Sequence, residues 1–198
     1  PASKWSQAAD VAFSYDEDFS LSTENSDRVE QSLAELQTAK EDGRDIVAVV
    51  PSSLLLKKTE GTAIDYVGRL IDLIHHLQQS GFHVVVLPNA TQQGIDTLRN
   101  NDIVAISRIR DGMASSAVGL GNLTVIDFDL NTAAIRRVLR ETVFVITSRF
   151  HAMVAALSLG VPTLVIGWSH KYDEVLADFG CREHALDFTE ADKDITDH

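Results

Sequence analysis

Several features that would assign a protein to a class are scarce or missing in this 198-residue chain. The single cysteine, Cys181, excludes an intrachain disulfide framework and any metal cluster built from cysteines alone. Lys and Arg number 17 against 29 Asp and Glu, which argues against a nucleic-acid partner because phosphates attract clustered cations. The most apolar stretch, 152–168, is interrupted by Gly160 and Pro162 and is shorter than the roughly 20 residues of a membrane span. No basic and apolar leader opens the sequence, so we expect a reduced, cytoplasmic protein.

Cofactor motifs are also missing. The first apolar run of the chain is followed by Pro51-Ser52-Ser53, without the glycine-rich loop that cradles a nicotinamide, a flavin or a nucleotide phosphate, so we expect no cofactor. No spacing of His, Cys and carboxylate residues is typical of zinc, and we expect no metal. Asp127 and Asp129 resemble the carboxylate pair with which some glycosyltransferases hold a metal, but we favour a solvated strand end.

The acidic residues gather at the two ends of the chain. Residues 1–45 carry 4 basic and 11 acidic side chains and residues 182–198 carry 2 and 6, whereas the middle is nearly neutral. The stretch 142–172 has no Asp or Glu, yet it contains several cationic residues: Arg149, His151, His170 and Lys171. Burial of an apolar stretch would explain the missing acids but not the cations, so this stretch is predicted to hold an anion.

The middle of the chain alternates short apolar runs with amphipathic segments. Strands are predicted over 45–50, 83–87, 122–128, 142–147 and 162–167, with a short edge strand at 186–188. Helices are predicted over 26–40, 66–80, 91–100, part of 102–118, 131–141, 150–159 and 172–179. Consecutive strand–helix units favour parallel strands joined by right-handed crossovers. The predicted fold is therefore a doubly wound α/β sheet, Rossmann-like, with helices on both faces.

In such a sheet, ligands bind beyond the carboxyl ends of the strands. Arg149 and His151 open a predicted helix at such an end, where unpaired N–H groups favour an anion. A guanidinium offers a bidentate fork to a phosphate or a carboxylate, and an imidazole can transfer a proton near neutral pH. We expect Arg149, as a strand-end site residue, to lie outside the core. The same rule nominates other polar residues that follow strands: Ser52, Ser53, Asn89, Ser148, Trp168, Ser169, His170 and Lys171.

Two motifs in this region carry a resemblance to a known family. Residues 145–152 read V-I-T-S-R-F-H-A, residues 156–162 read A-L-S-L-G-V-P, and Lys171 follows the next predicted strand. This pattern resembles the polysaccharide pyruvyl transferase family, in which an S/M-R-x-H-A helix start precedes A-L-x-x-G-V-P, a strand and a lysine. The resemblance implies a domain of the GT-B carboxyl-terminal type over 46–188, with 189–198 as an acidic tail.

The resemblance also implies a second domain outside this chain. Family members are GT-B-like, and a GT-B-like active site lies in the cleft between two domains. We therefore interpret residues 1–45 as an acidic connector with an amphipathic helix, the remnant of a link to a missing amino-terminal domain. That domain would supply the rest of the cleft.

Ketal formation is the activity that the resemblance implies. Family members transfer pyruvate from phosphoenolpyruvate to two hydroxyls of a sugar in polysaccharide biosynthesis, and they release phosphate. By matching positions, Arg149 is assigned to the anionic donor, His151 to proton transfer and Lys171 to the donor's carboxylate or phosphate. The scheme requires no metal and no cofactor. The substrate-binding residues would be Ser148, Ser52, Ser53, Asn89, Trp168, Ser169 and His170.

Two other functions stay open on the sequence alone. A GT-B glycosyltransferase or an epimerase-like domain would bind a nucleotide sugar at the same helix start. A non-catalytic module would keep the fold for regulation or assembly, although Arg149, His151 and Lys171 together count against a degenerate site. Ligand preference separates the three functions, because they predict binding of phosphoenolpyruvate, of uridine diphosphate, or of neither.

Overall fold

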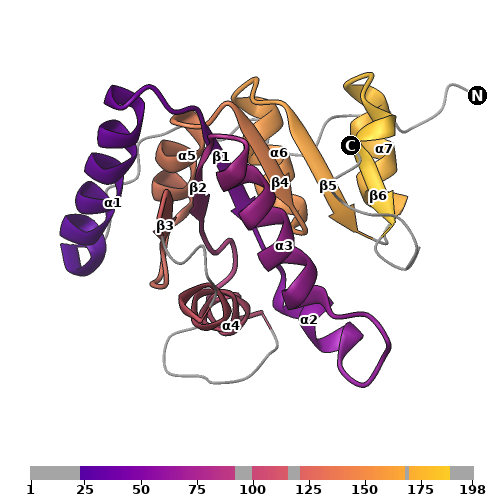
Figure 1. Cartoon of the computed structure of the whole chain (residues 1–198). Helices are drawn as coiled ribbons and strands as arrows, with labels where there is room; N and C mark the ends of the chain where they lie inside the picture. The colour runs from indigo at the N-terminus through magenta and orange to yellow at the C-terminus, as the bar shows by residue number, and fades with distance from the viewer. Residues whose placement is uncertain (1–22, 92–99, 116–120, 168–169, 188–198) are drawn as a thin grey trace, which may run out of the picture.

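The computed structural model describes residues 23–91, 100–115, 121–167 and 170–187. Six parallel strands form one sheet in the order β3-β2-β1-β4-β5-β6, with helices packed against it (Figure 1). The predicted doubly wound, Rossmann-like α/β fold is thereby confirmed. In chain order the elements are α1 (Thr23–Glu41), β1 (Ile46–Val50), α2 (Ser53–Thr59), α3 (Tyr66–Gln79), β2 (His83–Val86), α4 (Ile103–Ala114), β3 (Leu123–Val125), α5 (Thr132–Arg140), β4 (Phe144–Thr147), α6 (Phe150–Ser158), β5 (Thr163–Gly167), α7 (His170–Asp178), a 3₁₀ turn (Arg182–His184) and β6 (Ala185–Asp187).

Helices cover both faces of the sheet because its central strands are apolar on both sides. In β1, Ile46, Ala48 and Val50 belong to a buried cluster that includes residues of α1, α5 and α6. Val47 and Val49, which point to the opposite face, belong to a cluster with residues of α2, α3 and α4. All of β1 is buried, which explains why it reads as an uninterrupted apolar run.

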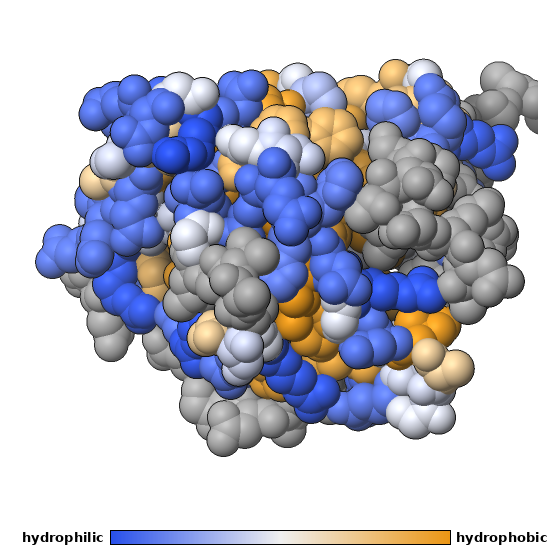
Figure 2. All heavy atoms as spheres, in the orientation of Figure 1, coloured by the Kyte–Doolittle hydropathy of each residue, from blue (hydrophilic) through white to orange (hydrophobic). Residues whose placement is uncertain are grey.

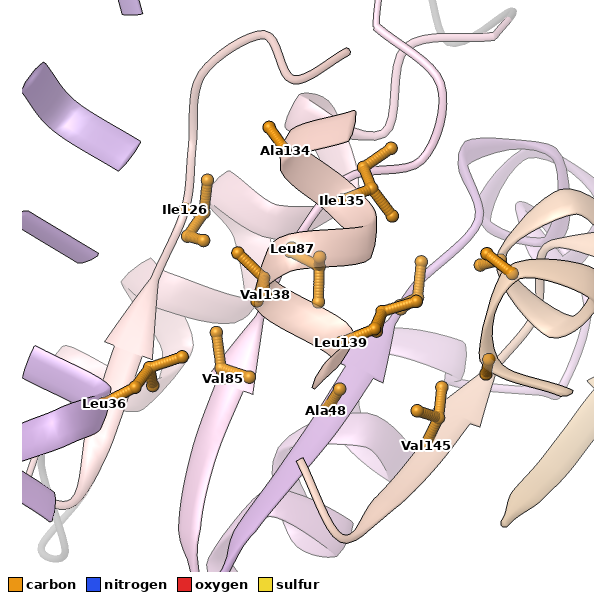
Figure 3. Packing of buried hydrophobic residues seen from close by; sticks show 14 of the residues in the cluster. Leu36, Ala48, Val85, Leu87, Ile126, Ala134, Ile135, Val138, Leu139 and Val145 are labelled. Atoms are coloured by element: carbon orange, nitrogen blue, oxygen red, sulfur yellow. The ribbon is translucent and has the colours of Figure 1, made fainter. Parts of the chain in front are cut away.

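Helix α5 closes the first of these clusters over the centre of the sheet. Figure 3 shows Val138 and Leu139 of α5 directed toward Val85 of β2 and Ala48 of β1. Polar side chains occupy the outer surfaces of the helices, and hydrophilic residues cover most of the face seen in Figure 2. Within the described part of the chain, no helix has the length and hydropathy that crossing a membrane requires.

Helix α1 corresponds to the amphipathic helix predicted over 26–40. Its Val29 and Leu36 are fully buried in the first cluster, so the helix covers part of the sheet's face without joining the sheet. Its outer side is tied to α5 by an exposed ion pair in which Nη1 of Arg137 donates to Glu30 at 2.6 Å.

Two segments differ from their predictions, and three others lie wholly or mostly outside the residues that the structure describes. Helix α2 was not predicted because its seven residues are too few to show a period. The strand predicted over 122–128 is only Leu123–Val125. The N–H of Ile126 still donates to the carbonyl oxygen of Val86 at 2.9 Å, and the carboxylate of Asp127, two residues beyond the strand, accepts from Arg28 and Arg110. The helix predicted over 91–100 lies outside the described residues apart from its two ends, and so do residues 1–22 and the predicted tail 189–198.

The strand order defines where a ligand site can form. From β1 the chain builds β2 and β3 on one side, then returns to place β4, β5 and β6 on the other side. The connections that follow β1 and β4 therefore leave the sheet toward opposite faces, and in sheets of this kind ligands bind at the carboxyl ends of two such strands. The segments at this switch point are the β1–α2 and β4–α6 loops.

Candidate functional site

Pairing of β1 with β4 brings two polar loops together at the switch point. The last residues of the two strands lie opposite each other in the ladder, and the N–H of Ser148 donates to the carbonyl oxygen of Val50 at 3.0 Å. Ser52 and Ser53 follow β1, and Ser148 and Arg149 follow β4; all four are buried. The Oγ of Ser52 caps α2 by accepting from the N–H two residues ahead.

Arg149 forms a buried ion pair with Asp102, the residue before α4. Its Nε donates to both carboxylate oxygens, at 2.9 and 3.0 Å, and its Nη2 donates to Oδ1 of Asp102 as well. Nη2 also donates to Oγ of Ser53 at 2.9 Å. The side chain of Arg149 is 10% exposed and that of Asp102 is 0% exposed. The expectation that Arg149 lies outside the core is therefore wrong, because its fork already holds a carboxylate of the chain itself.

The carboxylate of Asp102 gathers three strand-end loops. In addition to Arg149, it accepts hydrogen bonds from the backbone N–H groups of Ser53 at 2.9 Å, Ala90 at 2.9 Å and Asn89 at 3.3 Å. Ser53 follows β1, Asn89 and Ala90 follow β2, and Arg149 follows β4. One buried carboxylate thus links the ends of three neighbouring strands.

The hydroxyl of Tyr66, the first residue of α3, makes a second link between loops. It donates to Oγ of Ser148 at 3.1 Å and accepts from the N–H of Ser52 at 3.0 Å. Burial raises the pKa of Tyr66 to about 12, so the phenol stays protonated at neutral pH. From α7, the hydroxyl of Tyr172 donates to the carbonyl oxygen of Ser148 at 3.2 Å, and burial raises the pKa of Tyr172 as well.

His151, in contrast with Arg149, is exposed. It is the second residue of α6, and its ring meets that of Phe150 edge-on with centroids 5.7 Å apart. The first turn of α6 contains no acidic side chain, and its backbone N–H groups lack partners within the helix. An anion at this helix start would therefore meet N–H donors, the neighbouring guanidinium and an imidazole open to solvent.

The remaining predicted site residues lie at or before the start of α7. His170 and Lys171 are its first two residues, so the backbone of α7 carries them just after β5, at the same end of the sheet as α6. Trp168 and Ser169 lie outside the described residues. The structure thus brings five of the residues nominated from the sequence into one polar network with His151 beside it: Ser52, Ser53, Asn89, Ser148 and Arg149. The network consists of two adjoining hydrogen-bonded groups, one around the carboxylate of Asp102 and one around the hydroxyl of Tyr66.

Three participants in this network were missed by sequence reasoning. Asn101 and Asp102 before an apolar helix are typical of an N-cap, which could have placed Asp102 at a helix start but not next to a residue 47 positions away. Tyr66 and Tyr172 belong to the buried stripes of their helices and read as core residues.

The carboxylate pair considered for a metal is engaged in part by arginines. Asp127 accepts from Nη2 of Arg28 at 3.0 Å and from Nη1 of Arg110 at 2.5 Å. Among the described residues, no group of three or more His, Cys, Asp or Glu side chains is arranged to hold a metal ion.

Fold and site together define a Rossmann-like domain whose polar network lies at the switch point between β1 and β4. The family model described as polysaccharide pyruvyl transferase matches residues 8–170, which include β1 to β5 and both sides of this network. The chain belongs to the polysaccharide pyruvyl transferase family, as the motifs around Arg149 and His151 indicated. Searches of curated proteins and of solved structures found no significant match.

Breaking the buried ion pair should destabilise the domain strongly. Arg149→Met leaves the carboxylate of Asp102 buried without its counter-charge, and we expect a loss of about 3–5 kcal/mol in the free energy of unfolding, measured in urea. Arg28→Met is the matched control, because it breaks an arginine–aspartate pair whose arginine is 52% exposed and should cost about 1 kcal/mol or less. Equal losses in the two variants would contradict the structural importance of the buried pair.

Alkaline pH should weaken the fold through Tyr66. In the unfolded chain the pKa of this tyrosine is 10.0, but in the folded protein it is about 12. Its contribution is therefore complete below pH 10 and is lost as pH rises toward 12, because the unfolded state binds fewer protons over that window. Tyr66→Phe cannot ionise, and its free energy of unfolding in urea should fall less steeply over this pH range than that of the unmodified protein. Identical slopes would contradict the assignment.

Proposed function

We propose that this domain transfers pyruvate from phosphoenolpyruvate to two hydroxyls of a sugar, producing a ketal and phosphate. The observation that carries the proposal is the start of α6, where a partly engaged guanidinium and an exposed imidazole stand two residues apart, inside the region matched by the pyruvyl transferase family. Membership of that family supports a transferase. The donor and the product are those that the resemblance to the family implies, and the chemistry of these side chains is compatible with them.

The donor-binding part of the proposal rests on charge. Phosphoenolpyruvate has a phosphate and a carboxylate, and the stretch 142–172 contains no acidic side chain that would repel them. The unpaired N–H groups of α6 would bind one anionic group together with the free edge of Arg149. Lys171, at the start of α7, would bind the other. Trp168, Ser169 and His170 would line the donor site from the β5 side. Ser52, Ser53, Asn89 and Ser148 would shape its floor through the network that holds Arg149.

Proton transfer is assigned to His151. In the proposed reaction, protonation of the methylene carbon of phosphoenolpyruvate makes a methyl group and leaves C2 electrophilic. One sugar hydroxyl adds to C2, the bond from C2 to the phosphate oxygen breaks, and the second hydroxyl then adds to C2 to close the ketal. The two hydroxyl protons balance the proton given to carbon and the one taken by phosphate. An exposed histidine at the anion site can supply the first proton and be reprotonated from solvent.

The sugar is proposed to enter from outside this domain. In GT-B-like enzymes the cleft lies between two domains, and an amino-terminal domain facing the carboxyl ends of β1 and β4 would complete the acceptor site. The scheme assigns every charge-stabilising and proton-transfer step to side chains and backbone N–H groups, so we propose that the reaction proceeds without a metal or a cofactor.

Calorimetric titration tests the donor. The chain is titrated with phosphoenolpyruvate, with inorganic phosphate and with uridine diphosphate. Tighter binding of phosphoenolpyruvate than of the other two ligands is the expected result. Preference for uridine diphosphate would favour a nucleotide-sugar glycosyltransferase, and binding of none of the ligands would contradict a donor site on this domain.

His151→Gln separates binding from chemistry. Because the variant removes the proton donor and leaves the helix start intact, we expect phosphoenolpyruvate affinity to change by less than about threefold while ketal formation falls by about 100-fold or more. Ketal formation is followed by mass spectrometry on a panel of p-nitrophenyl glycosides, with the chain joined to the amino-terminal domain that is proposed to complete the acceptor site. His76→Gln, at an exposed histidine of α3, is the control and should leave both properties unchanged. Full ketal formation by His151→Gln would remove this residue from the proton-transfer role.

A further inference from the structure

Few of the N–H donors of Arg149 remain available to a ligand. A guanidinium has five N–H bonds. The one on Nε donates to the carboxylate of Asp102, and the two on Nη2 donate to Asp102 and to Oγ of Ser53. Nη1 donates to no residue in the described part of the chain. The two N–H bonds of Nη1 are therefore the edge of Arg149 that an incoming anion can use.

Through its side chain, Asp102 binds Arg149, which is distant in the sequence, and does not cap its own helix. It occupies the N-cap position of α4, yet its side chain makes no capping hydrogen bond. Instead, Oδ1 of Asn101 accepts from the N–H of Ile103 at 3.3 Å. Buried ion pairs can often be replaced by apolar side chains without loss of stability, so stability alone gives a poor account of a pair at the ligand end of the sheet.

We propose that Asp102 is a positioning residue for donor binding, which aims the free Nη1 edge of Arg149 at an anion in front of α6. The inference rests on the proposed function and adds a residue that selects the donor. A guanidinium held on two sides loses little conformational freedom when a ligand arrives. The negative charge of Asp102 also offsets the positive charge of Arg149. An anion is therefore attracted by the oriented N–H bonds of Arg149 more than by the net charge of the pair.

This arrangement should favour an anion with two charged groups at a fixed separation. Phosphoenolpyruvate must place its phosphate and its carboxylate on separate donors, so it depends on the direction of Nη1. Inorganic phosphate is compact and can bind a cation from any side. Loss of the Asp102 charge should therefore reduce selectivity between these two ligands, which a purely structural role of Asp102 would not do.

Asp102→Asn is the central test because it removes the charge and keeps the shape. By calorimetry on the full chain, we expect its affinity for phosphoenolpyruvate to fall at least tenfold, while its affinity for inorganic phosphate stays the same or rises. Asp127→Asn is the matched control: this aspartate also follows a strand and pairs with arginines, Arg28 and Arg110, away from Arg149. The affinities of Asp127→Asn for phosphoenolpyruvate and for inorganic phosphate should change less than twofold. Circular dichroism and thermal melting establish that each variant is folded.

A nuclear magnetic resonance signal separates the failure of this inference from the failure of the proposed function. The signal of the Nε–H of Arg149 is assigned by its absence in Arg149→Lys. This proton should exchange slowly with solvent in the unmodified chain and rapidly in Asp102→Asn. Slow exchange in the unmodified chain, rapid exchange in Asp102→Asn and loss of selectivity for phosphoenolpyruvate in that variant together support the inference. Unchanged selectivity in Asp102→Asn, or an equal fall in both affinities, overturns it and leaves the proposed function standing. Absence of phosphoenolpyruvate binding by the unmodified chain overturns the proposed function and this inference with it.

A second variant keeps the test decisive where Asp102→Asn does not fold. Ser53→Ala removes the acceptor of Nη2 and leaves the ion pair in place. We expect a three- to tenfold loss of phosphoenolpyruvate affinity with little change for inorganic phosphate. A folded Ser53→Ala variant with unaltered selectivity would overturn the inference.

Discussion

The buried pair of Arg149 and Asp102 is the interaction on which the ligand end of this domain depends. Each charge alone would cost several kcal/mol to bury, and only close, multiple hydrogen bonding offsets that cost. Here the carboxylate receives the guanidinium on both oxygens and three backbone N–H groups as well. The consequence is geometric: loops that follow β1, β2 and β4, which lie far apart in the sequence, converge on one acceptor.

Arg149 is buried whereas His151, two residues later, is exposed, and the start of α6 explains the difference. Arg149 precedes the helix in an extended conformation, with φ −120° and ψ 127°, and its side chain reaches into the network. His151 lies within the first turn and is exposed. Two residues along the chain are enough to change direction from core to solvent because the helix begins between them. Under the proposed function, the group that would hold an anion is thus immobilised, and the group that would exchange protons with water is accessible.

The fold could be predicted from the sequence because strands buried on both faces read as unbroken apolar runs, as β1 does, and because the helices between them show a period. The same reasoning placed the candidate site at the strand ends, where the structure has the polar loops that meet at Asp102. The environment of Arg149 could not be predicted, because an ion pair across 47 residues leaves no local pattern. Helix α2 was too short to show a period. Of the two serines nominated there as ligand contacts, Ser52 caps that helix and Ser53 accepts from Arg149. The ligand-binding and catalytic roles of all the nominated residues stay predictions.

The shared acceptor at Asp102 has a consequence for how this domain can be re-engineered or can diverge. Because three loops complete one another's hydrogen bonding, none of them is an independent module. A β4–α6 loop transplanted alone into another Rossmann-like scaffold would bring Arg149 without its counter-charge. A β1–α2 loop replaced alone would remove the N–H of Ser53 from Asp102 and the Oγ of Ser53 from Arg149. The effects of substitutions in these loops on the free energy of unfolding should therefore be non-additive. New ligand specificity would have to arise by exchanging the three loops as one unit.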